Sequence, residues 1–187
     1  MKNFVDLHCH FVPGIDDGAR DDAEGILMLQ ELKKLGFDTV IATPHMRPGL
    51  FDNARAELQT AYERLQPRMA QPDLPSTALS SEHYFDDVIY HRLLAGEGLP
   101  YPGGKAVLLE FYEIDFPPMI DRCFAELRRR GLLPVIAHPE RYRCLWGSFS
   151  ALERLVDGGA AALLDTAALV GKYGRSAQGC SERILEA

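Results

Sequence analysis

The chain has 187 residues, enough for one domain with a substantial core. Apolar residues make up 47% and charged residues 25%, and the net charge of −7 excludes bulk attraction to nucleic acid or to an anionic membrane. No apolar run approaches the roughly 20 residues of a membrane span, and the N-terminus lacks the apolar segment of a signal peptide. The 4 cysteines form no CxxC pair. We therefore expect free thiols in a cytoplasmic protein with no membrane insertion and no nucleic-acid partner.

Short apolar runs alternate with longer amphipathic segments. The runs predict strands, and because they are continuous rather than alternating, we expect strands that are covered on both faces. Helices are predicted over residues 21–36, 53–69 and 117–133. The first has Asp21 or Asp22 as its N-cap and Gly36 as its end. The predicted strands are Phe4–Leu7, Thr39–Thr43, Thr77–Ser81, Ala106–Phe111, Pro134–Ala137 and Ala161–Asp165.

This alternation predicts an α/β fold with a mostly parallel sheet, either open or closed into a barrel. The positions of residues that could act in catalysis or bind a metal help to choose between an open sheet and a barrel, because most of these residues follow the ends of predicted strands. They are His8 and His10 after the first strand, His45 after the second, Glu82 after the third, Glu110 at the C-terminal end of the fourth and His138 after the fifth. Reactive groups on the C-terminal rim of many strands favour a barrel, whereas an open sheet gathers its site at one switch point.

The stretch "DLHCHFVPGIDDG" places His8 and His10 two residues apart at the end of an extended segment. Residues i and i+2 of a strand face the same side, so both imidazoles are directed toward one centre. One such pair is weak evidence for a metal site, because isolated histidines are more often surface or hydrogen-bonded core residues. Further histidines and carboxylates at equivalent positions strengthen the evidence for a metal site. Ligand sets without cysteine favour Mn²⁺, Fe or Zn²⁺, and a glutamate can bridge two ions.

Arg141 lies three residues after His138 in "HPERY". A guanidinium beside divalent cations would suit a phosphate, although a surface arginine paired with Glu140 is an equal alternative. By strand alternation Cys9 faces away from the two histidines and is expected to pack. We expect His83 and His91 on the exposed sides of a turn and a helix.

Six segments carry a family resemblance: in order, "DLHCHFVPGIDDGA", "ATPHMRPGLF", "SSEHYF", "LLEF", "VIAHPERYR" and "LLDTAALVGKYG". They resemble the motifs of the PHP (polymerase and histidinol phosphatase) superfamily, and most closely its bacterial tyrosine-protein phosphatase branch. The resemblance implies a single PHP domain over residues 1–187 with a distorted (β/α)₇ TIM-like barrel. It also implies a di- or trinuclear metal cluster, commonly Mn²⁺, and hydrolysis of phosphotyrosine. The implied substrate is the tail of a bacterial tyrosine kinase that controls capsule or exopolysaccharide synthesis. The oligomeric state is left open, and a homo-oligomer is compatible with the family.

The resemblance also implies a role for each site residue. His8 and His10 would hold one ion, Glu110 would bridge to a second that Glu82 and His138 complete, and His45 would hold a third. An aspartate of "IDDG" would join His45, with Asp17 favoured over its neighbour Asp16. Arg141 would bind the phosphate.

The sequence departs from the family pattern at its end. The family continues into a last strand with a Ser-Asp-x-His motif, which supplies two more ligands, whereas this sequence ends at "GCSERILEA" within the expected preceding helix. From the family pattern we therefore expect a barrel without its closing strand. Two alternatives therefore stay open beside the protein phosphatase: a PHP phosphoesterase for a small phosphate such as histidinol phosphate, and a catalytically inactive remnant that acts by binding. An amidohydrolase would need a metal-bridging lysine, and none follows a predicted strand.

Overall fold

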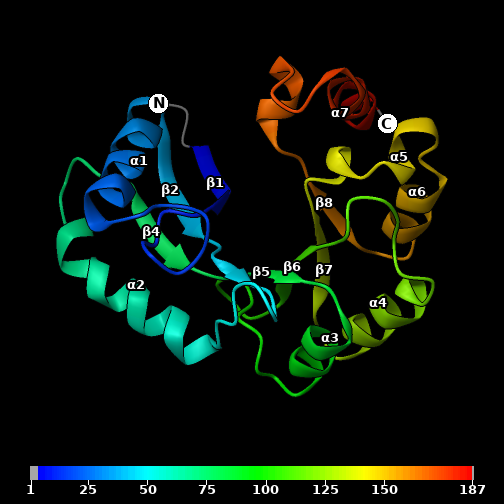
Figure 1. The fold of residues 1–187 in the computed structure, drawn as a ribbon, viewed down its shortest axis with the longest axis horizontal. Coiled ribbons are helices and arrows are strands. Elements are labelled where there is room, and N and C mark those ends of the chain that lie inside the picture. Colours follow the sequence, from blue (N-terminus) through cyan, green and yellow to red (C-terminus); the bar gives the residue numbers. More distant parts are fainter. Residues whose placement is uncertain (1–3, 187) are drawn as a thin grey trace. The chain divides into compact units, whose positions relative to one another are not determined.

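The computed structural model describes residues 4–186, which form two compact units, residues 4–107 and 108–186. Figure 1 labels most of the elements along the chain. The strands are β1 (Phe4–Cys9), β2 (Phe37–Ala42), β3 (His45–Met46), β4 (Ser76–Leu79), β5 (Glu82–Tyr84), β6 (Ala106–Glu110), β7 (Leu133–Ala137) and β8 (Ala161–Leu163). The helices are α1 (Asp22–Lys34), α2 (Arg55–Met69), α3 (Asp87–Leu94), α4 (Ile120–Arg129), α5 (Cys144–Gly147), α6 (Ser150–Asp157) and α7 (Arg175–Glu186). Two 3-10 turns, η1 (Pro139–Arg141) and η2 (Thr166–Val170), complete the set.

The first unit contains a parallel sheet with the strand order β1-β2-β4 and a separate parallel pair, β3 and β5. Helices α1 and α2 cover one face of the larger sheet (Figure 1). The core between them is built from fully buried side chains of the chain after β1, of both helices and of β2, among them Phe11, Leu29, Val40 and Leu65. All six predicted strands form, and the predicted parallel α/β fold is confirmed.

Helix α1 shows why the sequence folds as predicted here. Asp21 is its N-cap, and the Asp21 carboxylate accepts a hydrogen bond from the backbone N–H of Glu24 at 3.0 Å. Ile26 and Leu29 lie one turn apart and are buried on the sheet. Gly36 follows the helix with φ +99°, a left-handed conformation that a side chain would disfavour.

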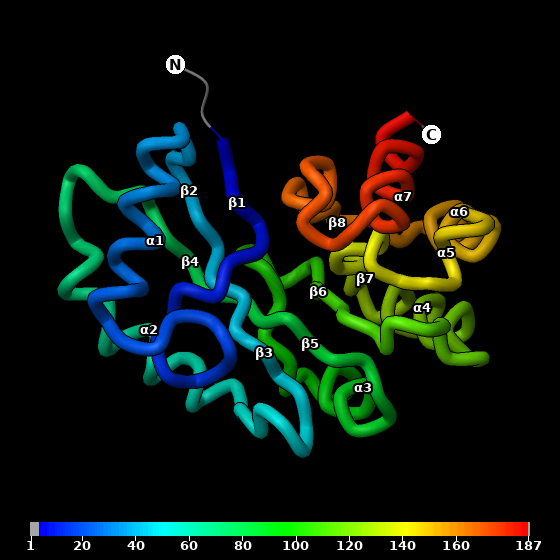
Figure 2. The backbone as a smooth tube through the Cα atoms, turned by 45° about the horizontal axis from the view of Figure 1, so that its top comes forward, coloured from blue at the N-terminus to red at the C-terminus, as the bar shows by residue number. Residues whose placement is uncertain are grey.

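Two short strands, β3 and β5, were not predicted. His45 pairs with Glu82 and Met46 with His83 in parallel register, and Figure 2 shows the two segments side by side. His45 and Glu82 therefore begin strands of their own rather than simply following the preceding ones. His83 was expected on the exposed side of a turn, and this was wrong. Its side chain is fully buried, and Nε2 accepts a hydrogen bond from the N–H of Leu99 at 3.1 Å, which compensates for the loss of water.

The expectation that every strand is covered on both faces was also wrong for β1. Phe4, Val5 and Leu7 are 44%, 52% and 42% exposed. The reason is positional: β1 is the outer strand of the β1-β2-β4 sheet and has a strand partner on one side only within the first unit. Its pairing with β2 is also irregular between Asp6 and Cys9, which breaks the regular alternation of sides.

In the second unit, β7 and β8 pair in parallel, with Val135 opposite Ala161. An aromatic cluster of Phe111, Phe116, Phe124 and Tyr142 forms its centre. The Tyr142 hydroxyl is also 3.1 Å from the Phe111 N–H, which donates to it. This anchors the chain after η1 to the chain after β6. The predicted strand end at Asp165 was wrong, since Asp165 is instead the N-cap of η2.

None of the helices described, within residues 4–186, is both long enough and apolar enough to cross a membrane.

Candidate metal centre

Three histidines of the first unit surround the carboxylate of Glu82. Its oxygens lie 3.4 Å from His8 Nε2, 3.3 Å from His10 Nε2 and 3.2 Å from His45 Nδ1. Glu82 is 1% exposed. The parallel pairing of β3 with β5 places His45 beside Glu82, while the end of β1 delivers His8 and His10. The predicted convergence of these four residues is therefore present in the structure.

The Nδ1 atoms of His8 and His10 are already engaged on the side away from Glu82. His8 Nδ1 lies 2.6 Å from the Thr43 hydroxyl, and His10 Nδ1 lies 2.7 Å from the Asp16 carboxylate. Such contacts fix the ring orientation of a metal-binding histidine and leave the opposite nitrogen available. Here the opposite nitrogen of each ring, Nε2, faces Glu82.

Asp16 and Asp17 occupy different positions despite being neighbours. The Asp16 carboxylate accepts from the backbone N–H groups of Gly18 and His45, both at 2.9 Å, in addition to its contact with His10. Asp17 is largely exposed, and its carboxylate lies 3.5 Å from His45 Nε2. Asp16 thus holds the backbone of two site segments together, while Asp17 offers a carboxylate on the open side of His45.

The charges of the cluster favour a cation. Burial opposes protonation of His10, but its hydrogen bonds to Asp16 and Glu82 outweigh burial and raise its pKa to about 10. Burial also opposes ionisation of Asp16, yet the bond to His10 leaves the pKa of Asp16 below its usual value. His45 responds in the opposite direction, because burial lowers its pKa. The carboxylates of Asp16 and Glu82 therefore favour a positive charge at His10, and an ion bound to His10 Nε2 would replace the proton there.

These residues fit a metal ion by donor type and by distance. One group comprises His8, His10 and Glu82, and another comprises His10, Asp17 and His45. In each group, one ligand atom from every residue lies within 4.8 Å of the others. Nitrogen and oxygen donors without sulfur suit Mn²⁺, Fe or Zn²⁺.

The remaining predicted site residues belong to the second unit. Glu110 is half-buried at the end of β6 and His138 is 4% exposed directly after β7. His138 has φ +33°, the one left-handed non-glycine backbone conformation among the described residues. Its N–H donates to the Leu163 carbonyl at 2.7 Å. Strained conformations of this kind persist where the surrounding structure enforces them, and they cluster at functional sites.

One interpretation of the sequence was that Arg141 pairs with Glu140, and this was wrong. Its guanidinium contacts the carboxylate of Asp165 and donates to the Tyr173 hydroxyl at 2.6 Å. The Tyr173 hydroxyl in turn donates to Asp165 at 2.7 Å. The guanidinium also lies 4.0 Å from the centre of the Tyr173 ring. Two residues of the "LLDTAALVGKYG" segment therefore hold Arg141 in a fixed orientation.

The sequence matches the family described as capsular polysaccharide synthesis, CpsB/CapC, over residues 4–187. The chain belongs to the CpsB/CapC family. It is 34% identical over 184 residues to the tyrosine-protein phosphatase YwqE of Bacillus subtilis, covering 98% of this chain and 72% of YwqE. It is 25% identical over 183 residues to the putative tyrosine-protein phosphatase CapC of Staphylococcus aureus, covering 97% and 72% of the two chains.

A solved structure supports the same family fold. It comes from the crystal structures of YwqE from Bacillus subtilis and CpsB from Streptococcus pneumoniae, described as unique metal-dependent tyrosine phosphatases. The TM-score is 0.91 at 34% identity, covering 98% of this chain and 75% of the other.

Sequence reasoning missed two polar residues that support the site of this CpsB/CapC member. Thr43 lies two residues before His45 in "ATPH", and its hydroxyl contacts His8 and accepts from the Cys9 N–H at 3.1 Å. Asn53 donates from its amide to the carbonyls of Ile15 at 2.8 Å and His45 at 2.9 Å. A small polar residue at the end of a buried strand was the available signal for Thr43. Asn53 had no such signal, because its partners are backbone atoms distant in sequence.

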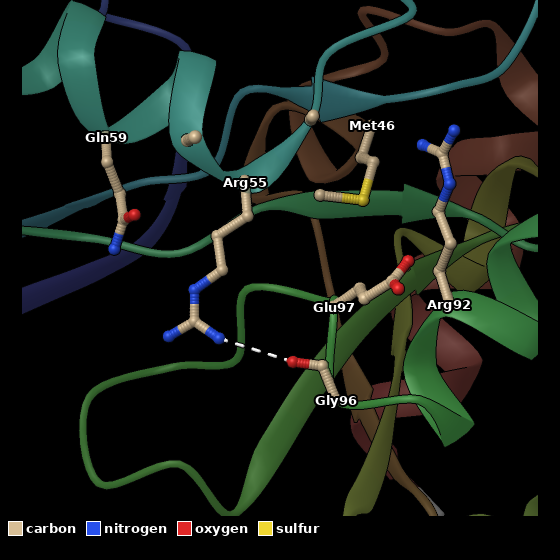
Figure 3. A pocket seen from close by; sticks show the side chains of 8 residues that line it. Met46, Arg55, Gln59, Arg92, Gly96 and Glu97 are labelled. Atoms are coloured by element: carbon tan, nitrogen blue, oxygen red, sulfur yellow. Dashed lines mark hydrogen bonds between the residues drawn. The ribbon is translucent and has the colours of Figure 1, made fainter.

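A pocket of about 460 Å³ lies on the other side of β3 from His45. Met46, the strand neighbour of His45, points into it, as alternation requires. Figure 3 shows that the guanidinium groups of Arg55 and Arg92 extend to different sides, with the Glu97 carboxylate between Met46 and Arg92. The pocket contains none of the candidate ligands and is separate from the metal centre.

Proposed function

We propose that this protein is a metal-dependent tyrosine-protein phosphatase of capsular polysaccharide synthesis. The observation that carries the proposal is the group of three histidines around one buried glutamate, in a chain of the CpsB/CapC family. The names of its relatives support the same activity. The proposed substrate is the phosphotyrosine tail of a bacterial tyrosine kinase in the cytoplasm.

The proposal includes the cofactor and the ligand set. A di- or trinuclear cluster, most simply of Mn²⁺, would be held by His8, His10, Asp17, His45, Glu82, Glu110 and His138. The contacts within the first unit support the first five of these, and the family resemblance supports Glu110 and His138. We also propose that the chain folds as a single PHP domain with a distorted (β/α)₇ barrel, of which the parallel strands are the supporting feature.

When bound, the metal ions would supply an activated water and neutralise charge on the phosphoryl oxygens. Arg141 would bind the phosphate, and its fork geometry suits two phosphoryl oxygens. Asp165 and Tyr173 restrict the Arg141 side chain, which lowers the entropy cost of holding it against the phosphate. Because Asp165 also neutralises Arg141, part of its charge is balanced before a phosphate enters.

A thiolate mechanism has no support in the arrangement of the cysteines. Cys9, the cysteine beside the two histidines, is 7% exposed, and burial raises its pKa to about 12. A thiol in that state is protonated at neutral pH and is a poor nucleophile. All four cysteines are free.

The first prediction compares His8→Ala with Cys9→Ser in the hydrolysis of a phosphotyrosine peptide with Mn²⁺. We expect Cys9→Ser to retain activity within about threefold, and His8→Ala to lose at least about 100-fold, because it removes a ligand. A chelator should abolish the wild-type rate. The proposal would be wrong if Cys9→Ser were inactive while His8→Ala retained activity, or if the folded wild-type chain hydrolysed nothing.

A further inference from the structure

The loop Arg47–Phe51 directly follows β3 and is closed on itself. The Arg47 N–H donates to the Phe51 carbonyl at 3.0 Å, and the Phe51 N–H donates back to the Arg47 carbonyl at 2.8 Å. Gly49 has φ +81° at the turn, and its N–H donates to the Asp52 carboxylate at 2.8 Å. These bonds fix where the side chains at the two ends of the loop lie.

Phe51 forms one wall beside the metal centre. Its ring lies parallel to the imidazole of His45, with 5.3 Å between ring centroids and 6° between the planes. His45 in turn lies 4.7 Å from the ring of His10. Phe51 is only half-buried, so an aromatic surface remains accessible next to the candidate ligands.

Arg47 and Tyr84 form a second wall on the same side of the β3–β5 pair. Tyr84 ends β5 two residues after Glu82, so strand alternation places its side chain on the side of the metal centre. Arg47 follows β3 and contacts the Tyr84 ring. The Arg47 guanidinium lies 4.0 Å from the centre of the Tyr84 ring. Both residues are half-buried, and within residues 4–186 no carboxylate forms an ion pair with Arg47.

We propose that Phe51, Tyr84 and Arg47 form the subsite that binds the aromatic ring of the substrate. This inference rests on the proposed function and gives a structural reason why the phosphatase would select phosphotyrosine. The phosphate of phosphotyrosine is joined directly to the ring, so phosphate held at the metal centre places the ring next to the centre's walls. Flat aromatic surfaces favour a flat ring by stacking and edge contacts. An alkyl phosphate offers no ring, so the subsite selects aryl over alkyl phosphates.

The role of Arg47 follows from its charge and its stacking. The central carbon of its guanidinium lies 4.0 Å from the centre of the Tyr84 ring, so the cation and the ring restrict each other beside the position of an incoming ring. Because no carboxylate neutralises it, it also attracts the anionic substrate. Arg141, which contacts Asp165, differs in this respect.

The test measures binding and turnover in parallel. The probes are two peptides of the same sequence, one with phosphotyrosine and one with phosphoserine, and their non-hydrolysable phosphonate analogues. The variants are Phe51→Leu, Tyr84→Leu and Arg47→Met, which remove a ring or a charge but keep apolar bulk. We expect each to weaken phosphotyrosine-phosphonate binding and the phosphotyrosine kcat/KM by about 5- to 10-fold. Phosphoserine-phosphonate binding should change less than about twofold in Phe51→Leu and Tyr84→Leu. In Arg47→Met it should weaken less than phosphotyrosine-phosphonate binding does, because the lost charge acts on both peptides and the lost stacking on one.

The control variant is Arg55→Ala, which removes an arginine of the same unit from the pocket behind β3 and should leave every value unchanged. Equal losses for both phosphonate peptides, or no loss for either, would overturn the subsite. Failure of the proposed function is a separate result: the wild-type chain would then hydrolyse neither peptide. In that case the phosphonate dissociation constants alone decide the subsite, and unchanged values in the variants would reject it.

Discussion

At the scale of single residues, the metal centre depends on hydrogen bonds that aim its ligands as much as on the ligands themselves. Thr43 and Asp16 each engage the Nδ1 of a histidine and direct its Nε2 toward Glu82. Asp16 also binds the backbone N–H of His45. Two adjacent aspartates therefore perform different tasks, one holding the site together and the other, Asp17, presenting a carboxylate on its open side.

Asn53 provides a test of this supporting role. Its amide joins the loop that carries Asp16 and Asp17 to His45, through the carbonyls of Ile15 and His45. Asn53→Ala should weaken Mn²⁺ binding by about 10-fold or more, the usual cost of losing an outer support of a metal site. It should also lower the free energy of unfolding by about 1–3 kcal/mol, because two carbonyls lose their donor.

Isothermal titration with Mn²⁺ measures the first effect, and urea unfolding of the metal-free chain measures the second. Gln71→Ala is the matched control, since the Gln71 amide also donates to a carbonyl, that of Arg68, but far from the ligands. If Asn53→Ala destabilised the chain yet bound Mn²⁺ as tightly as the wild type, Asn53 would be structural only.

At the scale of elements, local pattern predicted the long elements well and the short ones poorly. Helix α1 has a cap, an apolar stripe and a glycine stop, all readable from sequence. Strand β3 has two residues and β5 has three, too few for any periodicity. They are strands only because they pair with each other. His83 was misplaced for the same reason, since its partner is the backbone of Leu99.

The convergence of the histidines was predictable because it needs only strand direction and side-chain spacing. Their orientation was not predictable, because Thr43, Asp16 and Asn53 act through contacts with distant segments. The same applies to Arg141. Its residue type indicated phosphate binding, but its partners Asp165 and Tyr173 lie 24 and 32 residues further along the chain. The two interpretations of Arg141 could not be separated without knowing which carboxylate is near.

Gly25 tests how tightly α1 packs against the segment after the first two histidines. In an exposed helix, Gly→Ala stabilises by about 1 kcal/mol through helix propensity. At Gly25 a Cβ would meet the Phe11 carbonyl oxygen at 2.3 Å, a backbone atom that cannot move without shifting its neighbour His10. We therefore expect Gly25→Ala to destabilise the chain by about 1–3 kcal/mol, the typical cost of overpacking.

Gly179, in α7, is the matched control. A Cβ there has nothing within 4 Å. Gly179→Ala should therefore stabilise by about 0.5–1 kcal/mol. Urea denaturation of both variants checks the pair. The two variants should change the free energy of unfolding in opposite directions. A stabilising Gly25→Ala would show that α1 does not lie as close to Phe11 as described.

At the scale of the whole molecule, the acidic chain, with a net charge of −7, has a local concentration of carboxylates that matters for stability. Glu82, Asp16 and Asp17 gather around three histidines, so part of the acidic charge is concentrated at one place in the first unit. Gathered carboxylates repel each other unless a cation lies among them. The folded chain should therefore gain stability from a divalent ion that the unfolded chain cannot bind as tightly.

Titration with Mn²⁺ should accordingly raise the melting temperature of the chain. A ligand that binds only the folded state at 100 times its dissociation constant stabilises by about 2.7 kcal/mol, which corresponds to a rise of about 5–10 °C for a chain of this size. Differential scanning calorimetry over a range of Mn²⁺ concentrations measures the shift, and a chelator should reverse it.

Glu82→Gln keeps the shape of the side chain but removes the charge that lies beside all three histidines. The rise should shrink to a small fraction in that variant, because a neutral amide is a poor ligand for a hard cation. Ca²⁺ distinguishes site binding from general screening, since it prefers six to eight oxygen ligands and suits a histidine-rich centre badly. An equal rise with Ca²⁺, or in Glu82→Gln, would mean that the ion acts on the overall negative charge and that the histidine cluster is not its site.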